Sequence, residues 1–336
     1  MNAAALSPYH LTTRETTAMA ALLLAGRVYT MLPVPLQGES QDAVRDSLDH
    51  APRYRRLLNN WLLLAPLFDA GVINTLCTGD DPVEQVKHAT ERIGRDDRWE
   101  PLRQFAHGDL FGDADAYLDT LCADLLKGGP DPGVALPACA GLDAFAAEHD
   151  LPVFRTGHAP SAGARANGGS GVASSGGSLA QQVEARLGEP LFSVGLPILK
   201  QAGARAISSA RAVLKPELAG LRDAVDAATL NPTALSAQAV RKAGAAYSAA
   251  FKRELGAKLN RDDEGGRRLV PGFVSLAARR VPLDAALISS IAAFNRASGA
   301  AATALATGKA VGSGGSSGGG GSLITLTVAA LDVEPL

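Results

Sequence analysis

The clearest structural signal lies near the end of the chain, in Leu323-Ile324-Thr325-Leu326-Thr327-Val328. Apolar residues and Thr alternate there, as in a strand that rests one face on a core. Residues 312–322, just before it, are almost entirely Gly and Ser. Such sequence has no side chains to bury and a large backbone entropy to lose, so it favours a flexible loop. The sequence therefore predicts a strand over 323–333 after a flexible loop.

A second Gly- and Ser-rich stretch, 156–178, is too long for an ordinary loop within a domain. We predict an N-terminal helical domain over 1–155, a flexible linker over 156–178, and a second helical domain over 179–336. The second domain should carry a further strand over 269–281. The expected fold class is α+β, predominantly α-helical, with a small β-sheet formed late in the chain.

Bulk composition indicates an ordinary globular protein. The chain has 336 residues, of which 46% are hydrophobic and 20% charged, and its net charge is −2. The abundance of Ala, Gly and Arg is typical of a bacterial sequence. The three Cys form no Cys-x-x-Cys pair, and no secretory signal is visible, so a cytoplasmic location is expected. The most apolar run, 61–68, is far short of the roughly 20 residues of a membrane helix, so no membrane partner is expected.

One short string suggests catalysis. His107-Gly108-Asp109-Leu110 resembles the catalytic loop of the aminoglycoside phosphotransferase and choline kinase family. The resemblance implies that Asp109 accepts the proton of an attacking hydroxyl. Ala114 stands where that family has a metal-binding Asn, although Asp113 is near. His107, Asp109 and Asp113 are thus the candidate catalytic residues, and the alternative is a turn that uses Gly and Asp for backbone reasons.

Metal and cofactor motifs are missing from the sequence. No two of the six His stand three or four residues apart, which disfavours a zinc site on one helix. Neither Gly-rich tract carries the Lys-Ser/Thr pair of a phosphate-binding loop. We therefore expect neither a metal nor a cofactor, and the sequence leaves open whether the protein is an enzyme.

The charges are unevenly distributed. Residues 80–150 hold 16 acidic and 6 basic residues, whereas residues 241–280 hold 10 basic and 4 acidic ones. The basic region, 252–280, is a candidate surface for an acidic partner or for nucleic acid. Its candidate partner-binding residues are Lys252, Arg253, Lys258, Arg267 and Arg268. The alternative is a solvated basic face without a partner.

The tail suggests a further kind of partner. A flexible linker that ends in an alternating strand can present that strand to another sheet, with Leu326 and Val328 as candidate contacts. Residues 326–331 also resemble the cargo-loading peptides of encapsulin cargo proteins, which end in a Leu-Thr-Val-x-x-Leu type string. The favoured alternative is that the tail is the last strand of its own domain.

Taken together, these features predict a non-enzymatic interaction, scaffold or regulatory protein with a protein partner. Two alternatives stay open. One is an enzyme with an acid and His site around 107–115. The other is a protein that binds nucleic acid or an acidic partner through 252–280.

Overall fold

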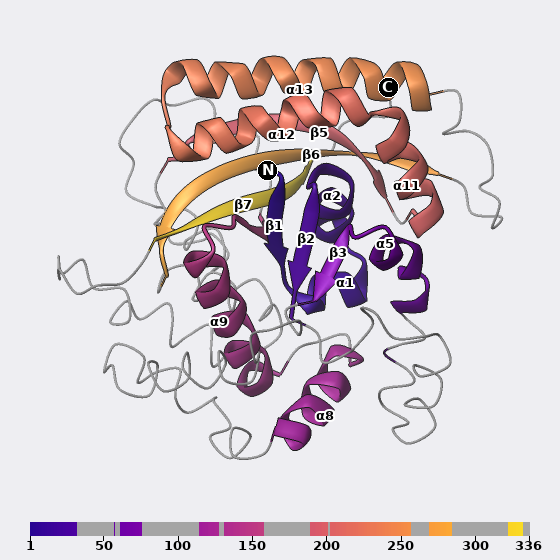
Figure 1. Cartoon of the computed structure of the whole chain (residues 1–336), viewed down its shortest axis with the longest axis vertical. Coiled ribbons are helices and arrows are strands. Elements are labelled where there is room, and N and C mark those ends of the chain that lie inside the picture. Colours follow the sequence, from indigo (N-terminus) through magenta and orange to yellow (C-terminus); the bar gives the residue numbers. More distant parts are fainter. Residues whose placement is uncertain are drawn as a thin grey trace, which may run out of the picture.

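The computed structural model describes residues 1–31, 57, 61–75, 114–127, 131–157, 189–200, 202–256, 269–283 and 322–331 (Figure 1). The strands are β1 Ala3–Leu6, β2 Arg27–Thr30, β3 Ile73–Thr75, β4 Val153–Thr156, β5 Phe192–Lys200, β6 Val270–Pro282 and β7 Ser322–Leu331. The helices are α1 Pro8–Thr13, α2 Thr16–Leu24, α5 Ala65–Asp69, α8 Ala114–Leu125, α9 Pro132–Glu148, α11 Ala204–Val213, α12 Lys215–Leu230 and α13 Ala234–Leu255.

The described strands form one seven-stranded mixed sheet in the order β3-β2-β1-β4-β7-β6-β5. Strands β3, β2, β1, β4 and β7 run parallel to one another. Strand β6 is antiparallel to both β7 and β5. The alternating tail recognised in the sequence is β7, which joins the parallel part of the sheet to the antiparallel part. It pairs with β4 and β6 of its own chain.

This sheet shows that the predicted fold class is wrong. The fold is not predominantly helical with a small late sheet, because strands at both ends of the chain build the same large sheet. Strands β6 and β7 lie close to the predicted ranges 269–281 and 323–333, and β4 falls within the first predicted domain. Strands from both sides of residues 156–178 therefore pair side by side.

The early strands escaped prediction because their composition is not strand-like. Strand β1 reads Ala-Ala-Ala-Leu and is buried on both faces, from Ala4 through Leu6. A strand buried on both faces shows no alternation, and Ala favours helices, so periodicity alone cannot identify it. The spacing of Met19, Leu22 and Leu23 favours one helix over 16–29, which would include the residues of β2. In the structure α2 ends at Leu24, and Gly26 separates it from β2.

Helices cover both faces of the sheet (Figure 1). On one face α2 packs against β4, β5 and β7, and α13 packs against β5. Helix α9 packs on the opposite face, against β1 and β7. Helix α2 is apolar around most of its circumference, and every residue from Thr17 to Leu24 is buried. It is the centre of the core, with α11 and α12 beyond it.

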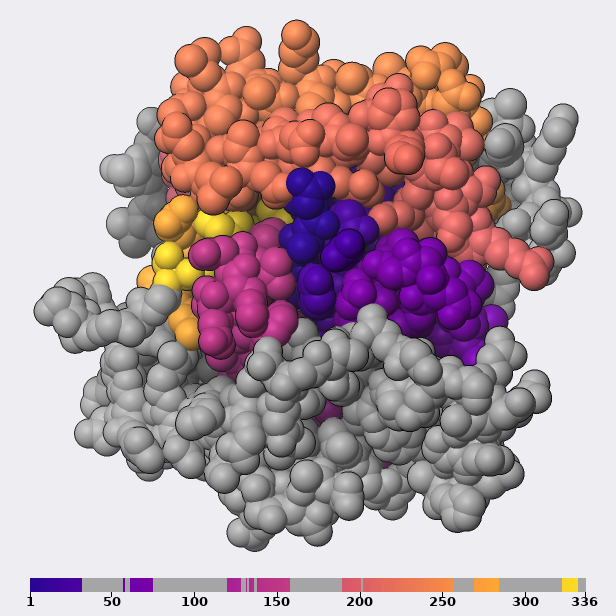
Figure 2. Space-filling view, viewed as in Figure 1, coloured from indigo at the N-terminus to yellow at the C-terminus, as the bar shows by residue number. Residues whose placement is uncertain are grey.

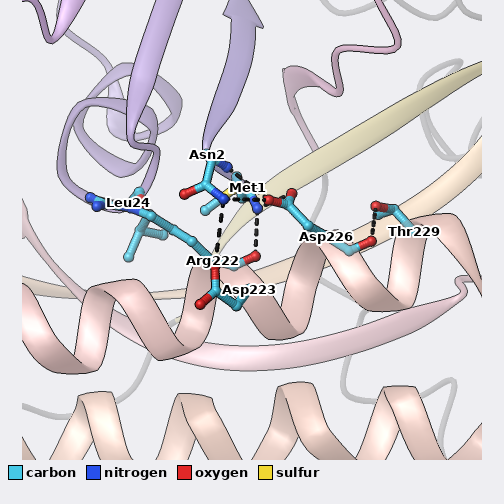
Figure 3. A network of polar contacts seen from close by, with 7 residues as sticks. All are labelled: Met1, Asn2, Leu24, Arg222, Asp223, Asp226 and Thr229. Atoms are coloured by element: carbon cyan, nitrogen blue, oxygen red, sulfur yellow. Dashed lines mark hydrogen bonds and ion pairs between the residues drawn. The ribbon is translucent and has the colours of Figure 1, made fainter.

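Two arginines close the carboxyl end of α2. The last carbonyls of a helix lack partners within the helix. The Arg211 guanidinium donates to the carbonyls of Leu22 at 2.7 Å, Ala25 at 2.6 Å and Gly26 at 2.7 Å. Arg222 donates to the Leu24 carbonyl at 2.7 Å (Figure 3). A buried helix end is thus satisfied by side chains nearly 200 positions later in the chain.

The start of β1 is fixed to α12 by a second polar network (Figure 3). The backbone N–H and the side-chain amide of Asn2 both donate to one carboxylate oxygen of Asp226, each at 3.0 Å. The amino group of Met1 donates to the Arg222 carbonyl at 2.5 Å and forms an ion pair with Asp226. In Figure 2 the indigo N-terminal residues accordingly lie directly beneath the orange helices.

Among the described residues, no helix is long and apolar enough to span a membrane. Helix α13, the longest of them, is amphipathic. Its N-cap Thr233 accepts from the backbone N–H of Ser236 in a capping box, and its Tyr247 hydroxyl donates to the Pro197 carbonyl of β5 at 3.0 Å.

Candidate functional site

The strand order reverses direction between β1 and β4. The chain builds β1, β2 and β3 outward to one side and then returns to place β4 on the other side of β1. In open α/β sheets, ligands bind at the carboxyl ends of the parallel strands where the order reverses, because the connections leave toward opposite faces there. The candidate site is therefore the edge formed by the ends of β1 and β4, called here the carboxyl edge.

Polar side chains are buried at this edge on the α2 face. The hydroxyls of Thr17, near the start of α2, and Thr156, the last residue of β4, lie 2.8 Å apart. Thr17 is fully buried. Thr30 ends β2 at the same edge and is also fully buried, and its hydroxyl has no hydrogen-bond partner among the described residues. Burial of a hydroxyl without its full set of hydrogen bonds costs free energy. The buried hydroxyls therefore make the carboxyl edge a polar part of an otherwise apolar core.

An imidazole–carboxylate pair lies in the connection from β1 to α2. His10 of α1 is buried, and its Nδ1 is hydrogen-bonded to a carboxylate oxygen of Glu15, the N-cap residue of α2. Because an ionised carboxylate only accepts, Nδ1 of His10 is the donor in this pair. A carboxylate that orients an imidazole in this way is the arrangement that general-base His residues use.

The opposite face of the edge holds a buried ion pair. Arg155 of β4 donates from Nη2 to Oδ1 of Asp143 on α9, at 2.6 Å, and both side chains are almost fully buried. Thr327 of β7 pairs in register with Arg155 and is buried beside it. A buried pair of this kind needs good geometry to offset desolvation, and removal of one partner leaves a buried charge.

Cys139 lies one turn before Asp143 on α9, and its thiol is hydrogen-bonded to Ser7, the N-cap residue of α1. Burial raises the pKa of the Cys139 thiol to about 12, and the neighbouring Asp143 carboxylate adds to that effect. Burial also raises the pKa of Asp143, against the opposing influence of Arg155. The thiol is thus kept neutral and is not an activated nucleophile.

Helix α8 is joined to the same edge by a carboxylate. The Tyr9 hydroxyl donates to Oδ2 of Asp124 at 2.6 Å, and the backbone N–H of Asp131 donates to both carboxylate oxygens at 2.9 and 3.0 Å. Asp124 is 1% exposed. This network fixes α1 against the turn between α8 and α9, so the residues after β1 are held rigidly.

Most of the candidate residues from the sequence fall outside the part of the chain that the structure describes. His107, Asp109, Asp113, Lys258, Arg267 and Arg268 lie outside the described residues. Lys252 and Arg253 are exposed on α13, and Arg253 contacts Glu254 at 2.7 Å and Glu217 at 3.8 Å. Leu326 and Val328 are buried in β7, where they pair with Phe154 and Thr156 of β4.

Sequence reasoning missed the residues of the carboxyl edge. Ser7-Pro8 is a usable signal, since Ser as N-cap with Pro at the first helical position marks a helix start. That signal gains meaning only once residues 3–6 are known to form a strand. Nothing local connects Thr17 with Thr156, which are 139 positions apart.

Comparisons of the chain with family models, with curated proteins and with solved structures found no match. Within the described part of the chain, no three His, Cys, Asp or Glu residues converge as a metal site.

Proposed function

We propose that the protein binds a small polar molecule at the carboxyl edge and acts on it through His10, oriented by Glu15. The observation that carries the proposal is the reversal of strand order between β1 and β4, with buried hydroxyls and an imidazole–carboxylate pair at that reversal. Thr17 and Thr156 would orient the ligand by hydrogen bonds. His10 would accept a proton from it at Nε2.

Ligand binding by wild-type protein and by edge variants tests the proposal. A panel of nucleosides, nucleotides, sugar phosphates and hydroxy acids, each at about 1 mM, would be screened by thermal shift and titration calorimetry. Thr17→Val and Thr156→Val should each weaken a binder by about two- to tenfold, the range for one neutral hydrogen bond. His10→Gln should abolish turnover of a bound substrate with less effect on its affinity.

The chain offers a matched control for these hydroxyls. Ser193 of β5 and Ser275 of β6 form an exposed hydroxyl pair 3.2 Å apart, far along the sheet from β1 and β4. Ser193→Ala and Ser275→Ala should leave ligand binding unchanged. A panel without any binder would contradict the proposal, and so would a binder whose affinity is insensitive to all three edge variants.

A protein-interaction role is a second proposal, supported by two exposed leucines. Leu230 ends α12 and Leu235 lies in the first turn of α13, and they are 78% and 77% exposed at the same helix–helix turn. Large apolar side chains gathered on a surface are typical of interaction sites. Leu230→Glu and Leu235→Glu should then abolish association with a protein partner, or self-association in sedimentation experiments. Unchanged sedimentation and unchanged partner binding would contradict this role.

A further inference from the structure

A cavity of about 300 Å³ opens at the opposite edge of the sheet, where the parallel strands begin. It is bounded by the first residues of β1 and β7, by the residues just before β4, by the end of β6, and by the last turns of α9 and α12. Figure 2 shows the corresponding colours meeting on one face, with indigo β1, magenta α9, yellow β7 and orange α12. The cavity is called here the amino-edge pocket, and none of its residues belongs to the carboxyl edge.

One cation and one anion on the pocket wall are available to a ligand. Arg280 of β6 donates from Nη2 to the Thr229 carbonyl at 3.1 Å, which holds the guanidinium at the pocket with its other N–H groups unused by described residues. Asp150 lies between α9 and β4 and is exposed, with no hydrogen bond or ion pair to another described residue. Asp226 also lines the pocket, but Asn2 and the amino group of Met1 already bind its carboxylate.

The rest of the wall is largely apolar. Leu323 and Ile324 of β7, Ala146 of α9 and Leu151 face the pocket together with Leu230, whose side chain is 78% exposed at its rim. An apolar group in the pocket would cover part of Leu230 and remove apolar surface from water on both sides. The volume suits a small molecule rather than a peptide segment.

We propose that the amino-edge pocket binds a free α-amino acid with an apolar side chain. Arg280 would bind the carboxylate, Asp150 would bind the ammonium group, and the apolar wall would contact the side chain. A guanidinium pairs well with a carboxylate, since its planar fork can donate two parallel hydrogen bonds. A ligand that carries both charges can place its carboxylate against Arg280 and its ammonium group against Asp150. Neither side chain then faces a group of its own charge.

Titration calorimetry with three matched compounds tests this proposal on the full chain. L-leucine carries both charges, leucinamide lacks the carboxylate, and 4-methylpentanoate lacks the amine. Leucine should bind at least about tenfold more tightly than either analogue, as expected from loss of one charge-assisted hydrogen bond. Methionine and phenylalanine should bind as well, because the apolar wall has no shaped polar group to exclude them.

Two variants and one control assign the contacts. Arg280→Gln and Asp150→Asn should each lower leucine affinity at least about tenfold. Both variants should fold, because Arg280 and Asp150 are exposed and Asn tolerates the positive φ of 52° at Asp150. Arg241→Gln removes one positive charge from the exposed side of α13, away from the pocket, and should leave affinity unchanged.

Three results would overturn the proposal. The first is no binding of leucine, methionine or phenylalanine at about 10 mM. The second is equal binding of leucine, leucinamide and 4-methylpentanoate, and the third is unchanged leucine affinity in both pocket variants. Thr17→Val and Thr156→Val should not alter leucine binding, so failure at this pocket and failure at the carboxyl edge are separate outcomes.

Discussion

Replacement of Arg211 by Met should destabilise the protein by about 3 kcal/mol. Met keeps an unbranched apolar stem of similar length, so the variant removes the guanidinium with little loss of packing. The guanidinium makes three hydrogen bonds of 2.6 to 2.7 Å to the end of α2. These bonds connect the second half of the chain to the helix at the centre of the core.

The magnitude follows from which carbonyls lose their donor. Arg222 still donates to the Ala25 carbonyl at 3.1 Å, so that group stays paired. The carbonyls of Leu22 and Gly26 lose their guanidinium donor. Each unsatisfied buried carbonyl costs about 1–3 kcal/mol, and partial access of water reduces the sum, which gives about 3 kcal/mol in total.

Chemical and thermal unfolding followed by far-ultraviolet circular dichroism would measure this loss. For a chain of this size the expected fall in Tm is about 4 °C, with an unchanged denaturant m-value. Arg241→Met is the control, because Arg241 is exposed on α13. If the two variants differ by less than about 0.5 kcal/mol, the capping argument is refuted. Arg211→Lys should be intermediate, since an ammonium group cannot donate in a fork.

Three further predictions concern the sheet and its covering helices. Asp143→Asn should destabilise the protein by about 3–5 kcal/mol, because it leaves the Arg155 charge buried and unpaired, whereas Asp143→Leu with Arg155→Met should be nearly neutral in urea unfolding. Cys139, with a thiol pKa of about 12, should react with iodoacetamide at pH 8 only at the rate of unfolding, and mass spectrometry showing fast labelling of the native protein would contradict this. Gly244→Ala should cost about 1–2 kcal/mol, because its Cβ would lie 2.5 Å from Cγ2 of Val194, and Val194→Ala should relieve that clash in a double-mutant cycle.

The sequence predicts those elements whose pattern matches their environment. Strand β7 alternates visibly and lies close to the predicted range 323–333, and α13 begins at a Thr N-cap and buries one stripe of residues. Strand β5 was not predicted from the sequence, and Pro197 lies in its middle. Pro is accepted there because β5 is an edge strand of the described sheet, where a missing N–H removes no ladder bond. Pro197 is therefore tolerated only because of the order of the strands in the sheet, and no local sequence pattern contains that order.

The candidate site was less predictable than the fold. Ser7 and Thr156 are ordinary residues until parallel pairing aligns the ends of β1 and β4. Arg155 lies in β4, whereas its partner Asp143 lies on a helix that covers the sheet. Residue type therefore gave no guide here, because the chemistry depends on contacts made between layers.

Strand β7 completes the surroundings of the buried Asp143–Arg155 ion pair. Strand β4 would be an exposed edge without it, since β7 is the neighbour that covers the side of β4 away from β1. Thr327 pairs with Arg155, and α9 packs against both β1 and β7, so the Asp143–Arg155 pair is enclosed only after β7 has joined the sheet. Residues 153–156 must then pair with residues 325–328, and because this contact has a very long sequence separation we expect it to form late in folding. The last strand of the chain thus completes the environment of side chains that belong to its first half.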